Sequence, residues 1–357
     1  MGKAYLVLEN GTVFCGESFG AVGEVTAEVV FTTGMTGYLE TLTDKSYFGQ
    51  IVVQTFPLIG NYGVISSDFE SGQIGPSAYI VKEWCQVPSN FRCEGDLDTF
   101  LKSKGIVGLC GIDTRALTKI IREKGVMNGA IVTDPANANF DKIHSYQVTN
   151  AVKSVSCESP TVFESDSENL HIALLDFGLK MNIAKELSKR ASKVTVCPHN
   201  TSAKQLKEMN IDGIMLSNGP GDPKENVEII ENLKEIMQLG IPIFGICLGH
   251  QLLALANGFD TSKLKYGHRG GNQPVKNLET GRVYISSQNH GYAVESKTID
   301  SRIASEYFIN VNDKTCEGVK YKNINAMSVQ FHPEACGGPL DTSFLFDEFI
   351  KNIKEGK

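Results

Sequence analysis

The sequence predicts an α/β protein in which an open, mostly parallel sheet flanked by helices follows a strand-rich N-terminal domain with few helices. Three observations lead to this class. The chain has 357 residues, more than one ordinary core accommodates. Short apolar runs alternate with amphipathic segments only in its second half. A polar stretch without apolar periodicity separates the halves. We therefore place an N-terminal domain at residues 1–150, a linker at 151–169 and a C-terminal domain at 170–357.

The N-terminal half contains mainly strand patterns. Residues 4–8 and 12–14 flank Asn10-Gly11, a dipeptide typical of hairpin turns, and residues 24–33 and 51–56 are further strand candidates. One helix is indicated over residues 114–122, where apolar residues recur at helical spacing. Asp113 can cap its first turn and Gly125 can end it.

The C-terminal half alternates between two kinds of segment. Apolar runs at residues 171–175, 194–197, 213–217 and 241–244 are separated by candidate helices at 182–191, 203–209 and 227–239. Such alternation is typical of parallel strands that are covered by helices.

Composition excludes several classes of function. Hydrophobic residues make up 41% and charged residues 21% of the chain, and its formal net charge is -7. No cluster of Lys or Arg exceeds a pair, so a nucleic acid or an anionic membrane surface would be repelled. Glu9 interrupts any signal-peptide core, and no apolar run reaches the roughly 18 to 20 residues of a membrane span. We expect a cytoplasmic protein.

The cysteines favour reduced thiols. The chain has nine cysteines, an odd number, and no C-x-x-C pair, which argues against a disulfide framework and against a zinc site. No metal is expected, and most of these cysteines should be ordinary buried thiols.

Cys247 is different because of its neighbours. It follows a buried-strand run at residues 241–244 and precedes a helical pattern at 248–256, with Gly245 and Gly249 two residues away on either side. This is the nucleophile-elbow pattern G-x-Nuc-x-G, whose tight turn needs small residues where strand and helix backbones pass closely. The positive end of the helix dipole favours a thiolate there, and the next backbone N–H groups face the same space. The pattern predicts a catalytic thiol that attacks a carbonyl carbon.

His332 is the best candidate for the base of this thiol. If residues 327–331 end a strand, side chains two positions apart project to the same side, so Glu334 can accept a hydrogen bond from His332. Pro333 stiffens the link between them. Nucleophile, base and orienting carboxylate would then occur in the order Cys247, His332, Glu334.

A Gly/Pro loop at residues 217–223 follows another buried strand. By itself this loop is equally compatible with a plain turn. It lacks the G-x-G-x-x-G spacing, and the chain contains no G-x-x-x-x-G-K-[ST], so we do not interpret it as phosphate-binding.

Motifs in both halves carry a resemblance to a known family. They lie at residues 31–38, 42–47, 59–63, 113–115, 265–272 and 287–294. With the elbow and the His-Pro-Glu run, the chain resembles class I (triad) glutamine amidotransferases, and more closely the small-subunit family of carbamoyl phosphate synthetases. The resemblance implies a small-subunit domain over residues 1–150 and a class I glutamine amidotransferase domain over residues 170–357.

The resemblance also implies a reaction. Cys247 would attack the side-chain carboxamide of glutamine, with the backbone N–H groups of Leu248 and Gly219 holding the oxyanion. His332, oriented by Glu334, would protonate the departing ammonia and then activate water on a glutamyl thioester. Residues implied to contact glutamine are Ser46, Gly219, Gly221, Leu248, Gln251, Asn289, Gly291 and Tyr292.

A partner follows from the same resemblance. Ammonia would pass to a large, ATP-grasp-like subunit that uses ATP, Mg and bicarbonate to make carbamoyl phosphate, for arginine biosynthesis, pyrimidine biosynthesis or both. The complex would be a C–N ligase heterodimer, and this chain itself would need no cofactor.

Three positions depart from the usual family pattern: Met181 replaces a common basic residue, Gln273 an expected histidine, and Cys336-Gly337 follow His-Pro-Glu-Ala. They concern details such as the partner contact rather than the reaction. Two alternatives remain open. The same triad would serve a free-standing cysteine hydrolase of γ-glutamyl amides, and a non-catalytic assembly subunit is the non-enzymatic alternative.

Overall fold

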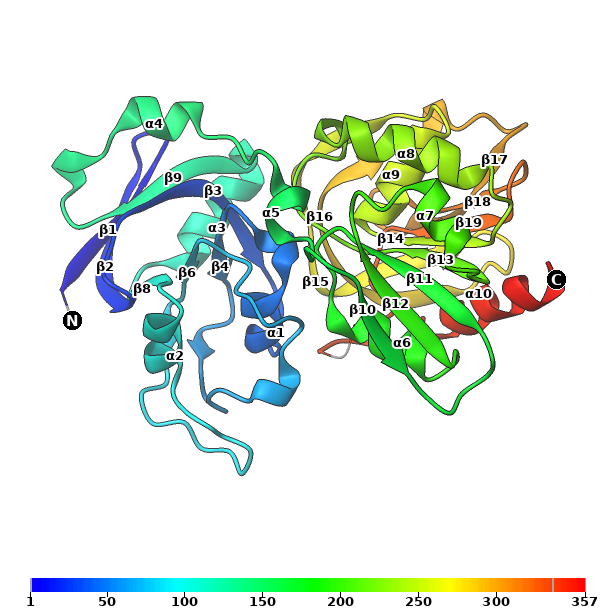
Figure 1. Ribbon diagram of the computed structural model, residues 1–357. Coiled ribbons are helices and arrows are strands. Elements are labelled where there is room, and N and C mark those ends of the chain that lie inside the picture. Colours follow the sequence, from blue (N-terminus) through cyan, green and yellow to red (C-terminus); the bar gives the residue numbers. More distant parts are fainter. Residues whose placement is uncertain (1, 336, 357) are drawn as a thin grey trace. The chain divides into compact units, whose positions relative to one another are not determined.

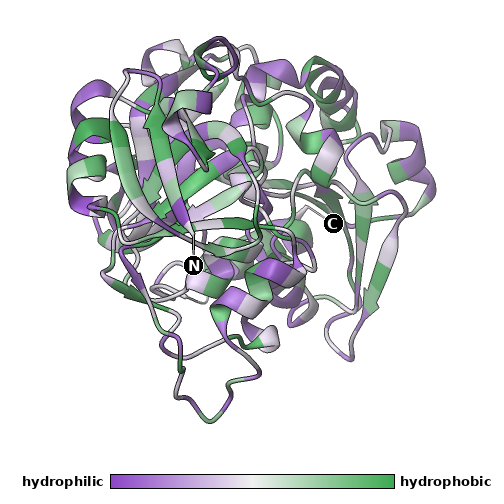
Figure 2. Cartoon of the chain, turned by 90° about the vertical axis from the view of Figure 1, so that its left-hand side faces the viewer, coloured by the Kyte–Doolittle hydropathy of each residue, from purple (hydrophilic) through white to green (hydrophobic). Residues whose placement is uncertain are grey.

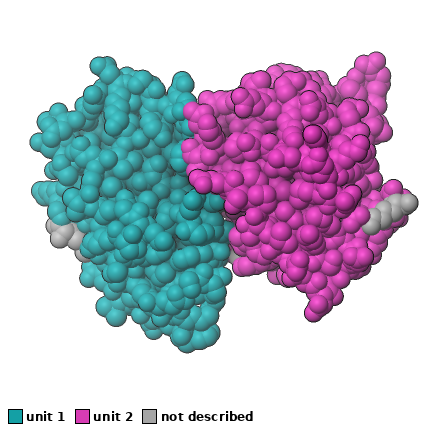
Figure 3. Space-filling view, viewed as in Figure 1, with its two compact units in different colours: residues 1–149 teal, residues 150–357 magenta. Residues whose placement is uncertain are grey.

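The computed structural model describes residues 2–335 and 337–356. The chain divides into two compact units, residues 1–149 and residues 150–357 (Figures 1 and 3).

The first unit is built around a closed β-barrel. Its strand order is β1-β2-β8-β6-β4-β3-β9. The strands are β1 (Lys3–Leu8), β2 (Val13–Gly20), β3 (Val25–Thr32), β4 (Gln50–Gln54), β6 (Ala78–Ile80), β8 (Val107–Cys110) and β9 (Met127–Val132). A short pair, β5 (Leu58–Ile59) and β7 (Glu83–Trp84), and the helices α1 (Tyr38–Thr43), α2 (Leu97–Ser103), α3 (Thr114–Lys124) and α4 (Phe140–Ser145) complete the unit, with the 3-10 turns η1 (Lys45–Tyr47), η2 (Ser66–Asp68) and η3 (Pro135–Asn137).

The hairpin turn and the helix cap predicted in this half are both present in the structure. Asn10-Gly11 joins β1 to β2, with Gly11 at φ 82°, where glycine avoids the steric cost of a Cβ. Asp113 accepts a hydrogen bond from the Ala116 N–H at 2.9 Å and so caps α3. Alternate residues of each barrel strand enter different apolar clusters, as Val52 does relative to Ile51 and Val53. Successive side chains of a strand thus point to opposite faces. Figure 2 shows the hydropathy of the residues along the chain.

The second unit is an open sheet with helices on both faces. The sheet order is β10-β12-β11-β13-β14-β19-β18-β17-β15-β16. The strands are β10 (Thr161–Glu164), β11 (His171–Asp176), β12 (Lys193–Pro198), β13 (Gly213–Leu216), β14 (Ile243–Ile246), β15 (Thr261–Asn277), β16 (Val283–Val294), β17 (Ala304–Asn310), β18 (Cys316–Tyr321) and β19 (Ala326–Val329). The helices are α5 (Ala151–Val155), α6 (Met181–Ser188), α7 (Ala203–Glu208), α8 (Val227–Met237), α9 (Leu248–Ala256) and α10 (Phe344–Glu355), and the 3-10 turns are η4 (Pro223–Glu225) and η5 (Ser296–Thr298).

The predicted α/β class with an open sheet is confirmed. Strands β12, β11, β13, β14 and β19 form a parallel block, and antiparallel strands extend the sheet on either side of it. Helices α7, α8 and α9 contribute to the apolar cluster on one face, and α6 and α10 to the cluster on the other. The parallel strands are therefore buried on both sides, which explains their nearly continuous apolar sequences.

The structure corrects the prediction that residues 151–169 form a linker. Helix α5 and strand β10 lie within it, and β10 pairs antiparallel with β12 at the edge of the sheet. An edge strand keeps much of its side-chain surface in water, so Thr161, Val162 and Glu164 are exposed and only Phe163 packs against the core. Polar composition therefore did not mark a linker here.

Candidate active site

Cys247 occupies a sharp turn between strand β14 and helix α9. It is the N-cap of α9 with φ 52° and ψ -105°, a left-handed backbone that is costly for any residue with a Cβ. Its N–H donates to the Val329 carbonyl at 2.9 Å and its carbonyl accepts from Gln251 at 3.2 Å. The strained residue is thus held by the neighbouring strand and by the first turn of its own helix.

The two flanking glycines are required by close backbone contacts. A Cβ on Gly245 would lie 2.9 Å from the carbonyl carbon of Gly249. A Cβ on Gly249 would lie 2.4 Å from the carbonyl oxygen of Leu216, on the adjacent strand β13. The structure thus gives the physical reason for the G-x-Cys-x-G spacing.

His332 and Glu334 lie just beyond β19, the strand next to β14. The Nδ1 atom of His332 is 2.6 Å from Oε1 of Glu334, and both side chains are buried. The His332 N–H donates to the Ser287 carbonyl at 2.9 Å, which fixes the backbone of the base. A proton on Nδ1 satisfies the carboxylate, so Nε2 is the ring nitrogen left for proton exchange.

Opposing influences set the pKa of His332. Burial lowers it most, and the nearby Lys180 ammonium lowers it too, but the Glu334 carboxylate and the Cys247 thiol together raise the pKa to about 10. The thiol and the imidazole are therefore electrostatically coupled. Within the described residues Nε2 makes no hydrogen bond of good geometry to a side chain or the backbone.

The Gly/Pro loop after β13 reaches the elbow. A Cβ on Gly219 would lie 2.2 Å from the Phe177 carbonyl oxygen and 2.8 Å from Cδ2 of Leu248. Gly221 has φ 88° and lies close to Ala151. Because Leu248 begins α9, its N–H belongs to the first turn, whose N–H groups lack partners within the helix. Two residues predicted to hold the oxyanion, Gly219 and Leu248, are thus neighbours.

Strand β16 contacts both the thiol of Cys247 and helix α9. The Cys247 thiol donates to the carbonyl oxygen of Asn289 at 3.7 Å. The Gln251 amide donates to the carbonyl oxygen of Tyr292 at 2.8 Å, and also to Oε1 of Gln330 at 2.8 Å. Gly291 lies between Asn289 and Tyr292 on β16, so this segment borders Cys247 on one side and α9 on the other.

Ser46 belongs to the first unit, in η1, where its N–H donates to Asp44 at 2.9 Å. Its assignment to glutamine rests on the resemblance. Of the departures from the family pattern, Met181 begins α6 and Gln273 lies on β15, whereas Cys336 is outside the described residues.

Several contributors to the site were not predicted. Lys180 lowers the pKa of His332, and buried Gln330 anchors Gln251. The Gly/Pro loop itself was identified from the sequence, but not the contact in which the carbonyl of its first residue, Ser217, accepts from the Gly249 N–H at 3.0 Å. Single-residue patterns give no signal for Lys180 or Gln330, because each acts through a partner that is distant in sequence.

One buried group has the composition of a metal site. His268, His290 and Glu317 each offer a ligand atom, and these atoms lie within 4.8 Å of one another. The described cysteines, Cys247 among them, are free thiols. Within residues 2–335 and 337–356, no helix combines the length and the apolar character that a bilayer span requires.

Comparison with known proteins gives two family matches. Residues 6–131 match the CPSase domain of the carbamoyl-phosphate synthase small chain, and residues 173–352 match class-I glutamine amidotransferases. Whole-chain relatives named carbamoyl phosphate synthase small chain occur in Clostridium perfringens (50% identity, 98% of this chain, 99% of the relative), in Listeria monocytogenes (49%, 98% and 97%) and in Bacillus cereus (50%, 99% and 97%).

Proposed function

Since the chain belongs to the carbamoyl phosphate synthase small chain family, we propose that it is the glutaminase subunit of such a synthase and releases ammonia from L-glutamine at Cys247. The family predicted from sequence motifs is confirmed. The observation that carries the proposed chemistry is the arrangement of three residues. Cys247 has a strained backbone, its thiol helps to raise the pKa of His332, and Nδ1 of His332 lies 2.6 Å from the Glu334 carboxylate.

The first half-reaction forms a thioester. The sulfur of Cys247 attacks the side-chain carboxamide carbon of glutamine, while the thiol proton passes to Nε2 of His332. The developing oxyanion is held by the N–H groups of Leu248 and Gly219, and one preorganised donor of this kind is worth about 10²- to 10³-fold in rate. His332 then gives its proton to the departing nitrogen, the C–N bond breaks, and ammonia leaves a glutamyl thioester.

The second half-reaction uses the same groups in reverse. Water gives a proton to Nε2 of His332 and attacks the thioester carbon, the C–S bond breaks, and the proton returns to the sulfur as glutamate leaves. Burial lowers the pKa of His332, but Glu334 and Cys247 raise it to about 10, so Nε2 is a strong acceptor for the thiol proton and keeps it until the departing nitrogen takes it. Glu334 stabilises that imidazolium without having to take its proton.

Glutamine recognition is assigned to the segments around the thiol. In the C-terminal unit these are the loop with Gly219 and Gly221, the start of α9 with Leu248 and Gln251, and the β16 segment with Asn289, Gly291 and Tyr292. Ser46 is the contribution proposed for the N-terminal unit.

A large subunit would consume the ammonia. It would combine ammonia with bicarbonate at the expense of ATP, with Mg, so this chain would carry no cofactor of its own. We expect a heterodimer or a larger assembly of such pairs, located in the cytoplasm. The match of residues 6–131 to the small-chain domain supports this function over a free-standing γ-glutamyl hydrolase. We favour a catalytic chain over a non-catalytic assembly subunit because His332, whose pKa Cys247 helps to raise, also pairs with Glu334 at 2.6 Å.

The test measures glutamate release by the purified chain, alone and with its co-purified large subunit plus ATP and bicarbonate. We expect weak hydrolysis by the chain alone and much faster hydrolysis by the complex. Cys247→Ser should abolish both activities, whereas Cys15→Ser, which removes an exposed thiol, should leave both unchanged. Retained glutaminase activity in Cys247→Ser would refute the mechanism, and rapid cleavage of γ-glutamyl peptides without any partner would favour the free-standing hydrolase.

A further inference from the structure

Ser46 lies directly after the short helix α1 of the first unit, and its position depends on that helix. Asp44 is both the C-cap of α1 and the N-cap of the 3-10 turn η1. Its side chain accepts from the Ser46 N–H at 2.9 Å, and the residue is 3% exposed. A buried carboxylate therefore connects Ser46 to the end of α1.

Helix α1 has only six residues and cannot hold this position alone. An isolated helix shorter than about 12–15 residues is marginal in water, so contacts with the rest of the unit must fix it. At its N-terminus the hydroxyl of Tyr62 accepts from the N–H groups of Gly37 and Tyr38 at 3.0 and 3.3 Å. The end next to Ser46 is held by a different segment.

Residues 70–75 close the C-terminal end of α1, and we call them the α1 clamp. The Gly75 N–H donates to the Leu42 carbonyl at 2.9 Å. The Ser71 hydroxyl donates to the Thr43 carbonyl at 2.8 Å. Both acceptors belong to the last turn of the helix, whose carbonyl groups have no partners within it, so the clamp satisfies them.

The contact between the clamp and the helix end is close and shielded from water. Thr43 and Ser71 are 1% and 8% exposed. The Thr43 hydroxyl accepts from the Glu70 N–H at 2.9 Å. A Cβ on Gly75 would lie 1.8 Å from the Asp44 carbonyl oxygen, so a glycine is needed where the two backbones pass. The clamp therefore packs against the residue that caps η1.

We propose that Ser71 is a positioning residue, which holds the end of α1 and thereby places Ser46 for its contact with glutamine. This role rests on the proposed function, in which Ser46 is the contribution of the N-terminal unit. Ser71 acts through the Thr43 carbonyl, and the next residue, Asp44, transmits the position of the helix end to Ser46. A displaced helix end would move Asp44 and, with it, the Ser46 N–H.

A purely structural clamp would have different consequences. It would lower the free energy of unfolding without changing how the folded complex binds glutamine. A positioning clamp instead weakens glutamine binding in molecules that stay folded, while the thiol chemistry at Cys247 proceeds as before. The KM for glutamine and kcat therefore separate the two roles.

The experiment compares Ser71→Ala with Ser103→Ala in the complex with the large subunit. Ser71→Ala removes one hydrogen bond, so the KM for glutamine should rise about 3- to 10-fold while kcat stays within about 2-fold. Ser103 is the matched control, because its hydroxyl donates to the Phe100 carbonyl at 2.7 Å at the end of another helix, α2. Ser103→Ala should leave the KM unchanged.

A double-mutant cycle identifies the residue through which Ser71 acts. In the Ser46→Ala background the contact with glutamine is already lost, so Ser71→Ala should change the KM by less than about 2-fold. Thr43→Val removes the acceptor of the Glu70 N–H and should behave as Ser71→Ala does in both backgrounds. Amide hydrogen exchange of residues 38–47 should be faster in Ser71→Ala, with exchange of residues 248–256 unchanged.

Each opposite result decides against the proposal. A wild-type KM in Ser71→Ala, an equal KM increase in Ser103→Ala, or an effect that persists in full in the Ser46→Ala background would overturn it. The proposed function fails separately, if the wild-type complex releases no glutamate from glutamine. Hydrogen exchange needs no turnover, so unchanged exchange of residues 38–47 in Ser71→Ala refutes the clamp whatever the reaction.

Discussion

Replacing Glu334 by glutamine tests how the base of the site is activated. The carboxylate accepts from Nδ1 of His332 at 2.6 Å, and neither side chain is more than 1% exposed, so solvent does not screen the pair. A hydrogen bond to a charged group contributes about 1.5–3 kcal/mol. Losing it from the imidazolium-like transition state should lower kcat about 10- to 150-fold, at about 1.4 kcal/mol for each factor of ten.

The pH dependence of kcat shows in which direction Glu334→Gln changes the pKa of His332. In the proposed mechanism His332 gives its proton to the departing nitrogen. Burial and Lys180 lower the pKa of His332, but Glu334 and Cys247 raise it to about 10. Without the Glu334 charge, less opposes the lowering of the His332 pKa by burial and by Lys180. The alkaline limb of kcat should therefore move down by about 1–2 pH units, at 1.36 kcal/mol per unit. The assay is steady-state glutamate release by the complex between about pH 6 and 10.

Glu231→Gln is the matched control for this change. Glu231 pairs with Lys234 at 2.7 Å on the surface of α8, with its side chain 63% exposed, so its loss should not change kcat or the pH profile. The reasoning fails if Glu334→Gln retains kcat within about 2-fold together with the wild-type alkaline limb, since the loss of the charge-assisted bond predicts more than that.

Two further predictions concern stability. Gly249→Ala places a Cβ 2.4 Å from the Leu216 carbonyl oxygen and should lower the free energy of unfolding by about 1–3 kcal/mol in urea titrations, whereas Gly72→Ala, with open space around its Cβ, should leave it unchanged. His268, whose pKa Asp313 helps to raise to about 9, should contribute stability that is complete below about pH 6.5 and lost as pH rises through about 9. Asp313→Asn should flatten this dependence in denaturant titrations, and an unchanged slope would contradict the pairing.

The proposed active site was predictable where its determinants are local. The elbow at Cys247 is encoded within five residues, because the two glycines that permit it adjoin the nucleophile. The contact of His332 with Glu334 followed from the two-residue period of an extended chain. Both arrangements need only one element and the chain immediately after it.

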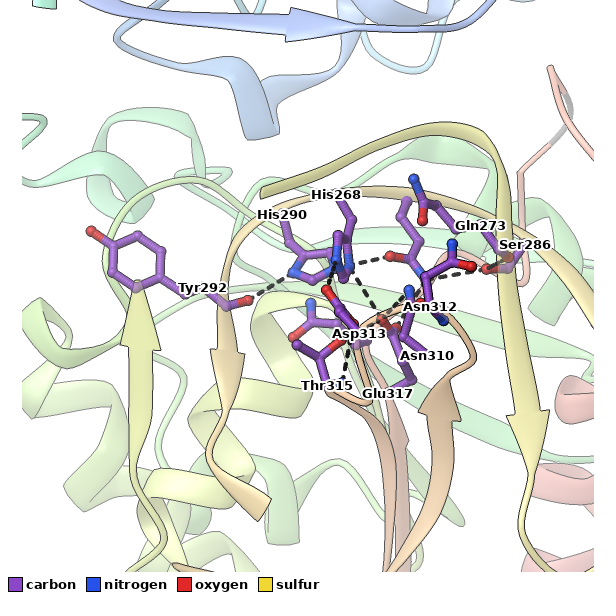
Figure 4. A network of polar contacts seen from close by, with 12 residues as sticks. His268, Gln273, Ser286, His290, Tyr292, Asn310, Asn312, Asp313, Thr315 and Glu317 are labelled. Atoms are coloured by element: carbon purple, nitrogen blue, oxygen red, sulfur yellow. Dashed lines mark hydrogen bonds and ion pairs between the residues drawn. The ribbon is translucent and has the colours of Figure 1, made fainter. Parts of the chain in front are cut away.

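Other features depend on pairing between distant segments. The long β15–β16 hairpin was not predicted, because its residues alternate irregularly between buried and exposed and its register shifts at two places. The group formed by His268, His290 and Glu317 (Figure 4) arises only when β18 is near this hairpin. Strand β10 was missed for the related reason that an edge strand can be largely polar and still contribute its backbone to a sheet.

The left-handed backbone of Cys247 has a consequence for how this protein can evolve. A residue with a Cβ in such a conformation costs about 1–3 kcal/mol, and the surrounding fold must supply that energy. Stability and activity are therefore in conflict at this position. A glycine there would relieve the strain but remove the sulfur, so selection for stability alone would drive the chain toward an inactive protein. Substitutions that raise the stability of this protein must therefore lie elsewhere in the unit, while Cys247 keeps its strained backbone.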